Sequence, residues 1–220
     1  VIAICILTRN RFSVLRRLVD SLRPALSPDV FLVVLDQAST DGTRQYLASE
    51  PVTAAWALYA DHNLGCAGGR QRQVDFLRAV LQPDEIAVFL DDDCYATNAT
   101  WLDALTGPIR RGEADICGVD GRHIDAHGMT WPLQPGEQPD YVSGGRMAVR
   151  AAVFEACAFD PRFNPNYYED VDFCFQARAA GYHIAAVGDV GMAHDDHPGD
   201  ATAAAKSMRA FVDKWRGRGL

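Results

Sequence analysis

The sequence predicts an α/β protein in which a mostly parallel sheet carries helices on both faces. Short apolar runs alternate with segments whose apolar residues recur at helical spacing, which is the pattern of βαβ units with right-handed crossovers. Polar clusters directly follow several of the apolar runs, at the strand ends where an open α/β sheet places its ligand. The 220 residues show no internal repeat and no Pro/Ser-rich linker, so we expect a single domain over residues 1–220.

The first part of the chain contains four strand-like runs separated by three helix-like segments. Residues 11–22 exemplify the helices, because their apolar side chains recur every three or four positions from Phe12 to Leu22. Polar residues follow three of the strands, at Thr8-Arg9-Asn10, Asp36-Gln37 and Asp91-Asp92-Asp93. The expected strands are 1–7, 30–35, 53–59 and 86–90, and the expected helices are 11–22, a short one through Tyr46 and Leu47, and 66–81.

The second part of the chain is less regular. Gly, Pro and His interrupt residues 107–139, in which we expect a hairpin around 123–131, and irregular segments beside a ligand-binding edge usually recognise a second substrate. Regular patterns then return. The expected elements are a strand at 146–149, a helical segment at 151–156, a helix at 170–180 that ends at Gly181, a last strand at 183–187 and a helix at 201–215.

Composition narrows the class of protein. The 48% hydrophobic and 23% charged residues are globular values, and no apolar stretch is long enough for a membrane span. The formal charge of −8 argues against a nucleic acid as partner. Six cysteines lack a CxxC pair, which favours buried free thiols in a reducing compartment. We therefore expect a cytoplasmic protein, and membrane association is not indicated.

The run Ala87-Val88-Phe89-Leu90 ends in three consecutive carboxylates, Asp91, Asp92 and Asp93. Adjacent acids repel one another, so a divalent cation among them would be stabilising. In an extended chain, alternate side chains share a face, which would let Asp91 and Asp93 converge on one ion while Asp92 faces elsewhere. Spacing alone leaves two alternatives, a metal site and a solvated acidic loop.

A second acidic cluster, Glu169, Asp170 and Asp172, lies at the start of an expected helix. Acids there commonly cap free amides and oppose the helix dipole, but such a carboxylate can also serve as a general base. His194 follows the last expected strand among further acids. It is either an ordinary hydrogen-bonded histidine or a metal ligand.

Several fragments in order resemble motifs of one enzyme family, the family 2 glycosyltransferases of the GT-A fold, and particularly their rhamnosyltransferase-like branch. The resemblance covers nearly the whole chain and implies a Rossmann-like sheet. His194 follows the last of these fragments in the chain, as the family's order of motifs implies. The fragments are Ile4–Arg11 (I-P-T-Y-N-R), Leu35–Thr43 (D-N-G-S-T-D-G-T), Asn63–Gln71 (N-x-G-x-A-G-G-x-N), Asp91–Asp93 (D-x-D), Tyr141–Arg150 (G-x-x-x-x-x-R), Asn166–Cys174 (Y-E-D-V-D-L-C) and Gly181–Ile184.

The resemblance implies an inverting, metal-dependent glycosyltransferase that moves a sugar from a nucleoside-diphosphate sugar, with UDP or dTDP as nucleotide, to an acceptor hydroxyl. Residues 1–93 would bind the donor, and residues 94–220 would supply the acceptor site and catalysis. Mn²⁺ or Mg²⁺ would be held by Asp91, Asp93 and His194. The donor residues it implies are Thr8, Arg9, Asn10, Asp36, Asn63, Gly68, Gly69, Arg70, Asp91 and Asp92.

The resemblance also implies catalytic roles. Asp170 would be the general base, while Glu169 and Asp172 would orient the base or the acceptor. Arg70 has two interpretations at this point, a contact with the diphosphate or a solvated side chain. Gln37, Gln71 and Gln73 depart from the family motifs, and we expect them around the donor.

Two functions from other classes stay open. A sugar-phosphate nucleotidyltransferase could use the same sheet and acids, but the turn Thr8-Arg9-Asn10-Arg11 lacks the Gly-rich loop that this chemistry usually needs. A non-catalytic nucleotide-sugar binding module is the other, against which the presence of Asp170 and His194 argues. The sequence leaves open whether the acceptor is a polysaccharide, a lipid-linked intermediate, a natural product or a protein.

Overall fold

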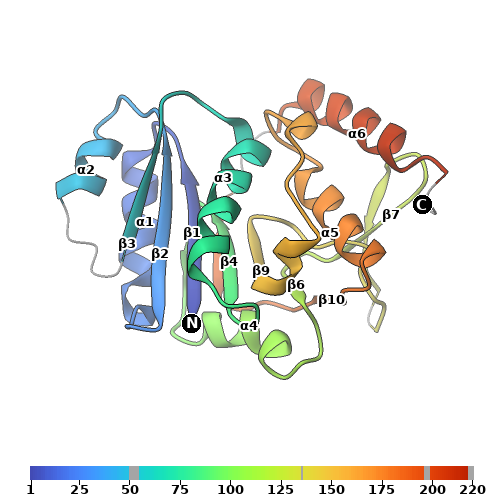
Figure 1. The fold of residues 1–220 in the computed structure, drawn as a ribbon, viewed down its shortest axis with the longest axis horizontal. Coiled ribbons are helices and arrows are strands. Elements are labelled where there is room, and N and C mark those ends of the chain that lie inside the picture. The colour runs from blue at the N-terminus through green and yellow to red at the C-terminus, as the bar shows by residue number, and fades with distance from the viewer. Residues whose placement is uncertain (50–54, 135, 196–198, 218–220) are drawn as a thin grey trace.

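A seven-stranded mixed sheet forms the centre of the molecule (Figure 1). The computed structural model describes residues 1–49, 55–134, 136–195 and 199–217. The strand order is β10-β6-β9-β4-β1-β2-β3. Four neighbouring pairs are parallel, and only β9 runs antiparallel to its two neighbours, β4 and β6. The predicted α/β class with a mostly parallel sheet is confirmed.

The elements of the first part match their predicted positions closely. Residues 53 and 54 of the predicted third strand lie outside the described residues. The elements are β1 (Ile2–Thr8), α1 (Phe12–Leu22), β2 (Val30–Gln37), α2 (Thr43–Ser49), β3 (Ala55–Ala60), α3 (Gly65–Val80) and β4 (Ile86–Asp91).

The second part contains more elements than the sequence pattern predicted. The predicted hairpin, β9, α5 and α6 are confirmed, whereas residues 151–156 form a 3₁₀ turn (Ala151–Glu155) rather than a longer helix. The elements are β5 (Cys94–Ala96), α4 (Trp101–Arg110), β6 (Ile116–Gly118), β7 (Arg122–Ile124), β8 (Thr130–Pro132), β9 (Arg146–Arg150), α5 (Glu169–Ala179), β10 (Ile184–Ala186), β11 (Met192–His194) and α6 (Ala201–Trp215).

Helix α4 and strand β11 are the differences that matter. The helix was missed because Gly107 and Pro108 lie in its last turn, although its buried residues Trp101, Leu102, Leu105 and Ile109 recur at helical spacing. The prediction that residues 183–187 are the last strand is wrong, because β11 follows. With three residues, β11 is too short for a periodic pattern to reveal it.

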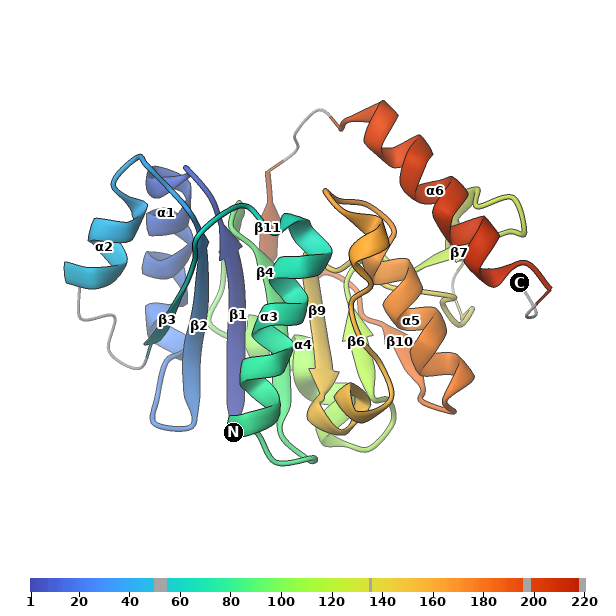
Figure 2. The same ribbon diagram turned by 45° about the horizontal axis from the view of Figure 1, so that its top comes forward.

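Helices cover both faces of the sheet, as predicted. One buried apolar cluster packs α3, α5 and α6 against one face, and a second packs α1 and α4 against the other (Figure 2). Five cysteines are buried and Cys66 is partly buried, and all six are free thiols. Among the described residues, no helix is long and apolar enough to cross a membrane.

The antiparallel strand β9 determines what lies beside the end of β4. It pairs with β4 from Ile86↔Arg150 to Leu90↔Arg146, so the residues that precede β9 pass the acidic end of β4. The Asp91 amide donates to the Gly145 carbonyl at 3.0 Å. The Ser143-Gly144-Gly145 segment therefore forms one wall at the carboxyl end of the central strand.

Candidate active site

A cavity of about 680 Å³ opens at the carboxyl end of β4 and the N-terminus of α5. Both predicted acidic clusters contribute to its walls, although they are far apart in the sequence. The charged lining residues are Arg11, Arg70, Asp91, Asp92, Asp93, Asp120, Arg122, Glu169 and Asp170.

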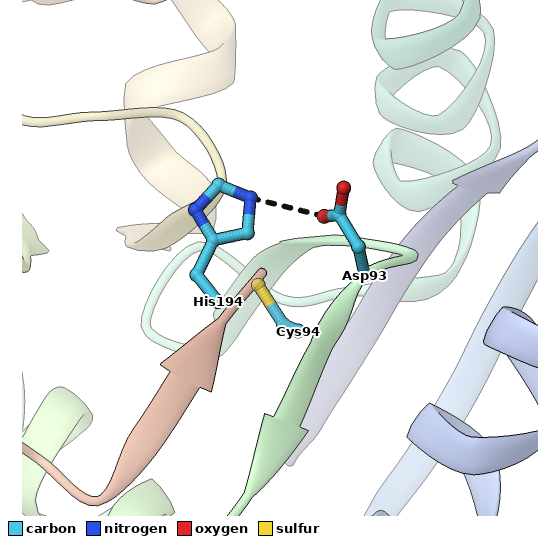
Figure 3. Close-up of side chains that lie close together, drawn as sticks. All are labelled: Asp93, Cys94 and His194. Atoms are coloured by element: carbon cyan, nitrogen blue, oxygen red, sulfur yellow. Dashed lines mark ion pairs between the residues drawn. The ribbon is translucent and has the colours of Figure 1, made fainter. Parts of the chain in front are cut away.

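Asp91 and Asp93 lie at one corner of this cavity, and His194 approaches them from β11; we call these three residues the metal corner. Figure 3 shows His194 beside Asp93, together with Cys94. His194 Nε2 lies 2.9 Å from Asp93 Oδ1 and 3.8 Å from Asp91 Oδ2. The histidine arrives by tertiary pairing, because β11 pairs antiparallel with β5 and places His194 opposite Cys94. Of the two predicted acidic ligands, Asp93 therefore lies closer to His194 than Asp91 does, and their role in binding a metal stays a prediction.

The metal corner has the chemistry of a divalent cation site. Two carboxylates and an imidazole are ligands that Mn²⁺ accepts, and carboxylates also suit Mg²⁺. The hydrogen bond to Asp93 raises the pKa of His194. Burial works to raise the pKa of Asp93, but His194 and Arg11 outweigh it and hold that pKa below its usual range. Asp93 is thus kept ionised by neighbouring positive charge.

Asp92 points away from the metal corner. Its Oδ2 accepts a hydrogen bond from the Thr8 hydroxyl at 2.8 Å, and its Oδ1 lies 3.0 Å from Arg11. Burial raises the pKa of Asp92 to about 6, against the opposing effects of Arg11 and Thr8. The triplet divides as the alternation rule predicted, but through a turn: β4 ends at Asp91, and Asp92 and Asp93 lie before β5.

Arg70 is neither solvated nor free to reach out from the surface. Its side chain is 1% exposed, and Nη2 donates to Asp91 Oδ1 at 2.7 Å. Nε and Nη1 find no hydrogen-bond partner among the described residues, and the guanidinium lies 5.4 Å from the centre of the Phe89 ring. The structure thus replaces the solvated interpretation with a buried ion pair between α3 and the metal corner.

Glu169 interacts with the charge of Arg70, although the two residues are far apart in the sequence. Its Oε1 accepts a hydrogen bond from the Cys66 thiol at 3.0 Å, while Oε2 has no partner among the described residues. Burial raises the pKa of Glu169 to about 7, with Asp170 adding to the effect and Arg70 opposing it. Near neutral pH, this carboxyl group is therefore poised between its two protonation states.

Asp170 faces the cavity from the first turn of α5. Its Oδ2 accepts from the Gly144 amide at 2.8 Å, and its Oδ1 accepts from the Val171 amide at 2.8 Å. Burial raises its pKa, and these two amides oppose the shift. A Cβ atom at Gly144 would lie 3.0 Å from the Asp170 Cβ, and one at Gly145 would lie 2.5 Å from Asp91 Oδ2. The two glycines allow both acids to approach one wall.

Asp172 does not take part in the cavity. Its carboxylate is fully buried and accepts from Lys214 Nζ at 2.7 Å, Trp215 Nε1 at 2.9 Å and Gln176 Nε2 at 2.7 Å. Residues two apart on a helix point to different sides, so Asp170 and Asp172 cannot share a face. The expected role in orienting base or acceptor is corrected: Asp172 anchors α6 to α5.

Four of the predicted donor residues lie at the ends of β1 and β2, outside the cavity lining. They are Thr8, Arg9, Asn10 and Asp36. Asp36 is fully buried, with Oδ1 accepting from the Ser39 amide at 3.2 Å and Oδ2 from Arg44 Nε at 3.1 Å. Asn10 connects the same loops, because its Oδ1 accepts from the Thr40 amide at 2.6 Å. Arg9 is exposed beside it.

The remaining predicted donor residues lie in the loop before α3 and in the first turns of that helix. Asn63 Oδ1 accepts from the Gly65 amide at 3.0 Å and so shapes the helix start. A Cβ atom added at Gly68 would lie 3.3 Å from the Leu64 side chain. One added at Gly69 would lie 3.0 Å from the Leu7 side chain. These glycines let α3 pack closely on neighbouring protein, which is a structural reason for them independent of any donor.

The three glutamines that depart from the family motifs have structural partners. Gln37 Oε1 accepts from the Leu64 amide at 2.9 Å, and Gln73 Nε2 donates to the carbonyls of Ile6 at 2.9 Å and Val33 at 3.0 Å. Gln71 Oε1 accepts from the Phe159 amide at 2.8 Å. Each of the three therefore has a structural role, and their expected position around the donor stays a prediction.

Sequence reasoning missed several residues of the cavity wall. Arg122 comes from β7 in the irregular segment, Tyr141 comes from the residues that precede β9, and Cys66 comes from α3. Tyr167 and Tyr168 adopt positive φ angles of 72° and 66°, and the Tyr168 hydroxyl donates to the Gly128 carbonyl at 2.7 Å. In the sequence, the two adjacent tyrosines directly before the acidic cluster were the available signal. In the structure, their backbone is strained, and strained backbone often accompanies function.

Comparison with solved structures identifies the fold. The structure of GalNAc-T7 with UDP, GalNAc and Mn²⁺ superposes with a TM-score of 0.80 at 16% identity, covering 98% of this chain and 48% of that one. Glucosyl-3-phosphoglycerate synthase from Mycobacterium tuberculosis, with Mn²⁺, UDP and phosphoglyceric acid, superposes with a TM-score of 0.68 at 20% identity. The match covers 97% of this chain and 78% of that one. A mannosyltransferase from Pyrobaculum calidifontis, with GDP-Man and Mn²⁺, superposes with a TM-score of 0.63 at 16% identity. The match covers 86% of this chain and 55% of that one.

These similarities show a GT-A fold, and the chain spans about half the length of the first and third of these structures. No curated protein sequence matches the chain significantly. A family model described as glycosyl transferase family 2 matches residues 3–156. Because this match covers well over half of the chain, the protein belongs to glycosyl transferase family 2.

Proposed function

We propose that this protein is an inverting, divalent-metal-dependent glycosyltransferase that moves a hexose or deoxyhexose from a nucleoside-diphosphate sugar to an acceptor hydroxyl. One observation carries the proposal: Asp91 and Asp93 of the metal corner line the same cavity as Asp170, which comes from a different element. A cation site beside a shielded base is what this reaction requires, because the diphosphate must leave the anomeric carbon as the acceptor oxygen attacks the opposite face of that carbon.

The donor diphosphate would lie at the metal corner. Asp91, Asp93 and His194 would hold Mn²⁺ or Mg²⁺, which when bound neutralises charge on the leaving nucleoside diphosphate. The similar structures contain UDP or GDP-mannose together with Mn²⁺, which supports such a donor. We propose UDP or dTDP as the nucleotide, with its base near Asp36 at the end of β2 and with residues 1–93 as the donor half.

Asp170 would act as the general base. One of its carboxylate oxygens takes the proton of the acceptor hydroxyl as the hydroxyl oxygen attacks the anomeric carbon, and the bond to the diphosphate oxygen breaks on the opposite face. Burial raises the pKa of Asp170, which makes the ionised group a stronger base than an exposed aspartate. The Gly144 and Val171 amides fix its orientation.

Replacement of the base tests this assignment. Asp170→Asn keeps the shape of the side chain and should lower kcat for transfer roughly 10²–10⁴-fold, the usual contribution of a general base. Binding of the donor nucleotide, measured by calorimetry with Mn²⁺, should change little. Asp213→Asn, at an exposed position on α6, is the matched control and should keep wild-type kcat. Full turnover by Asp170→Asn would show that another group is the base.

Metal removal tests the second half of the proposal. Transfer should stop when EDTA is added and return with excess Mn²⁺, while circular dichroism shows that the fold persists. Undiminished transfer in EDTA would overturn the metal dependence and leave the assignment of Asp170 standing.

A further inference from the structure

We propose that Cys94 adds a sulfur ligand to the metal corner, so that Asp93, Cys94 and His194 form a site for a thiophilic divalent cation such as Zn²⁺ or Co²⁺. Their ligand atoms all lie within 4.8 Å of one another (Figure 3). The inference rests on the proposed function in one respect, because it shares Asp93 and His194 with the proposed Mn²⁺ or Mg²⁺ site.

Strand pairing places the thiol beside the imidazole. Cys94 and His194 are direct register partners in the antiparallel pair of β5 and β11. Side chains of directly opposite residues project from the same face, with Cβ atoms roughly 4.5–5.5 Å apart. The Asp195 amide also donates to the Asp93 carbonyl at 3.2 Å, which holds the acidic turn and the end of β11 together. The sulfur is thus part of the corner by backbone geometry and not by a chance rotamer.

The donor set decides which metals use the sulfur. Mg²⁺ and Mn²⁺ prefer oxygen, whereas thiolate together with imidazole and carboxylate is a set typical of Zn²⁺ and also of Co²⁺. The Cys94 thiol now faces the Gly145 carbonyl at 3.4 Å. On binding, the metal–sulfur bond forms as the thiol proton leaves to solvent. Asp91, with Oδ2 3.8 Å from His194 Nε2, is within reach as a fourth ligand.

Occupancy by Zn²⁺ and by Mn²⁺ is therefore mutually exclusive, because both need Asp93 and His194. Zn²⁺ bound through Cys94 occupies the place where the donor diphosphate would meet its metal. We infer that thiophilic cations compete with Mn²⁺ at this corner, with the thiol as the element that discriminates between the two kinds of metal.

Cobalt spectroscopy of the reduced, metal-free protein tests the sulfur ligand without any activity measurement. Titration with Co²⁺ should give both visible d–d bands and a near-ultraviolet sulfur-to-cobalt charge-transfer band. Cys94→Ser should lose the charge-transfer band and keep d–d bands. Cys66→Ser, which removes the thiol elsewhere in the same cavity, should keep both. Cys94→Ala repeats the test should the serine variant fold poorly.

Competition measurements give the second readout. Zn²⁺ affinity should fall at least ~10-fold in Cys94→Ser, while Mn²⁺ affinity should stay within about threefold. Co²⁺ bound to wild-type protein without a charge-transfer band, or with the same band in Cys94→Ser, would overturn the inference and leave the Mn²⁺ site intact. Failure of both Co²⁺ and Mn²⁺ to bind would instead remove the metal site of the proposed function as well.

Discussion

The two acidic clusters contain the same kinds of residue, but Asp93 in the first and Glu169 and Asp170 in the second have pKa values shifted in opposite directions. In Asp91–Asp93, the charges of His194 and Arg11 outweigh burial and keep the pKa of Asp93 low. At the start of α5, burial dominates and raises the pKa of Glu169 to about 7 and that of Asp170 above its usual range. The difference shows that counter-charge, more than residue type, decides whether an acid is suited to hold a cation or to accept a proton.

In each cluster, one acid points away from its neighbours and contacts other parts of the protein. Asp92 turns to Thr8 and Arg11 because a tight turn follows β4. Asp172 turns to Lys214 because it lies two positions from Asp170 on a helix. Within each cluster, local backbone geometry thus directs one carboxylate into hydrogen bonds or ion pairs with other parts of the protein.

The largest expected effect separates the two clusters by metal binding. His194→Ala should weaken Mn²⁺ binding by ~100-fold or more, because loss of even an outer partner of a metal ligand costs ~10–100-fold. Asp170→Asn should leave Mn²⁺ affinity within about threefold. Isothermal titration calorimetry checks both variants, and equal losses in the two would erase the distinction between the clusters.

Stability should distinguish Asp172 from Asp170. Asp172→Asn leaves the partly buried Lys214 with one carboxylate partner, Asp160 at 2.9 Å, so the free energy of unfolding should fall by about 1–3 kcal/mol. The variant should keep wild-type kcat. Urea denaturation and a transfer assay measure the two quantities, and a catalytic defect without loss of stability would return Asp172 to the active site.

Arg70 links the clusters through its charge. Removing it in Arg70→Met should raise the pKa of Glu169 further above about 7, because this guanidinium opposes the effect of burial. The carboxyl signal of Glu169 can be followed by infrared difference spectroscopy, with Arg11→Met as the comparison on the metal side. An unchanged or lower pKa in Arg70→Met would show that the clusters are electrically independent.

The smallest expected effect concerns the hairpin beside the cavity. His123 lies between Glu137 at 2.9 Å and Asp140 at 3.1 Å, and these hydrogen bonds raise its pKa. The stabilisation from its charge is therefore fully present below the unfolded pKa of about 6.5 and is lost as pH rises through the folded value. Urea midpoints should show this decline in wild type and less of it in His123→Gln. Parallel pH curves for both would exclude His123 as the cause.

The sequence was most informative where one local pattern decided the outcome. Buried strands such as Ile86–Asp91 and the amphipathic helix Ala201–Trp215 appeared where they were predicted, because period and length suffice for such elements. Prediction was poorest between residues 94 and 118, where three-residue strands and a helix ending in Gly107-Pro108 depend on tertiary packing for their stability.

The sequence by itself determined the class of sheet and which acids stand at its strand ends, because hydrophobic periodicity and turn chemistry are local. The tertiary structure alone decided that His194 reaches Asp93, that Arg70 is buried against Asp91, and that Asp172 belongs to the core. These contacts join residues distant in sequence, and no local pattern records which strand pairs with β5 or which side of α5 meets α6.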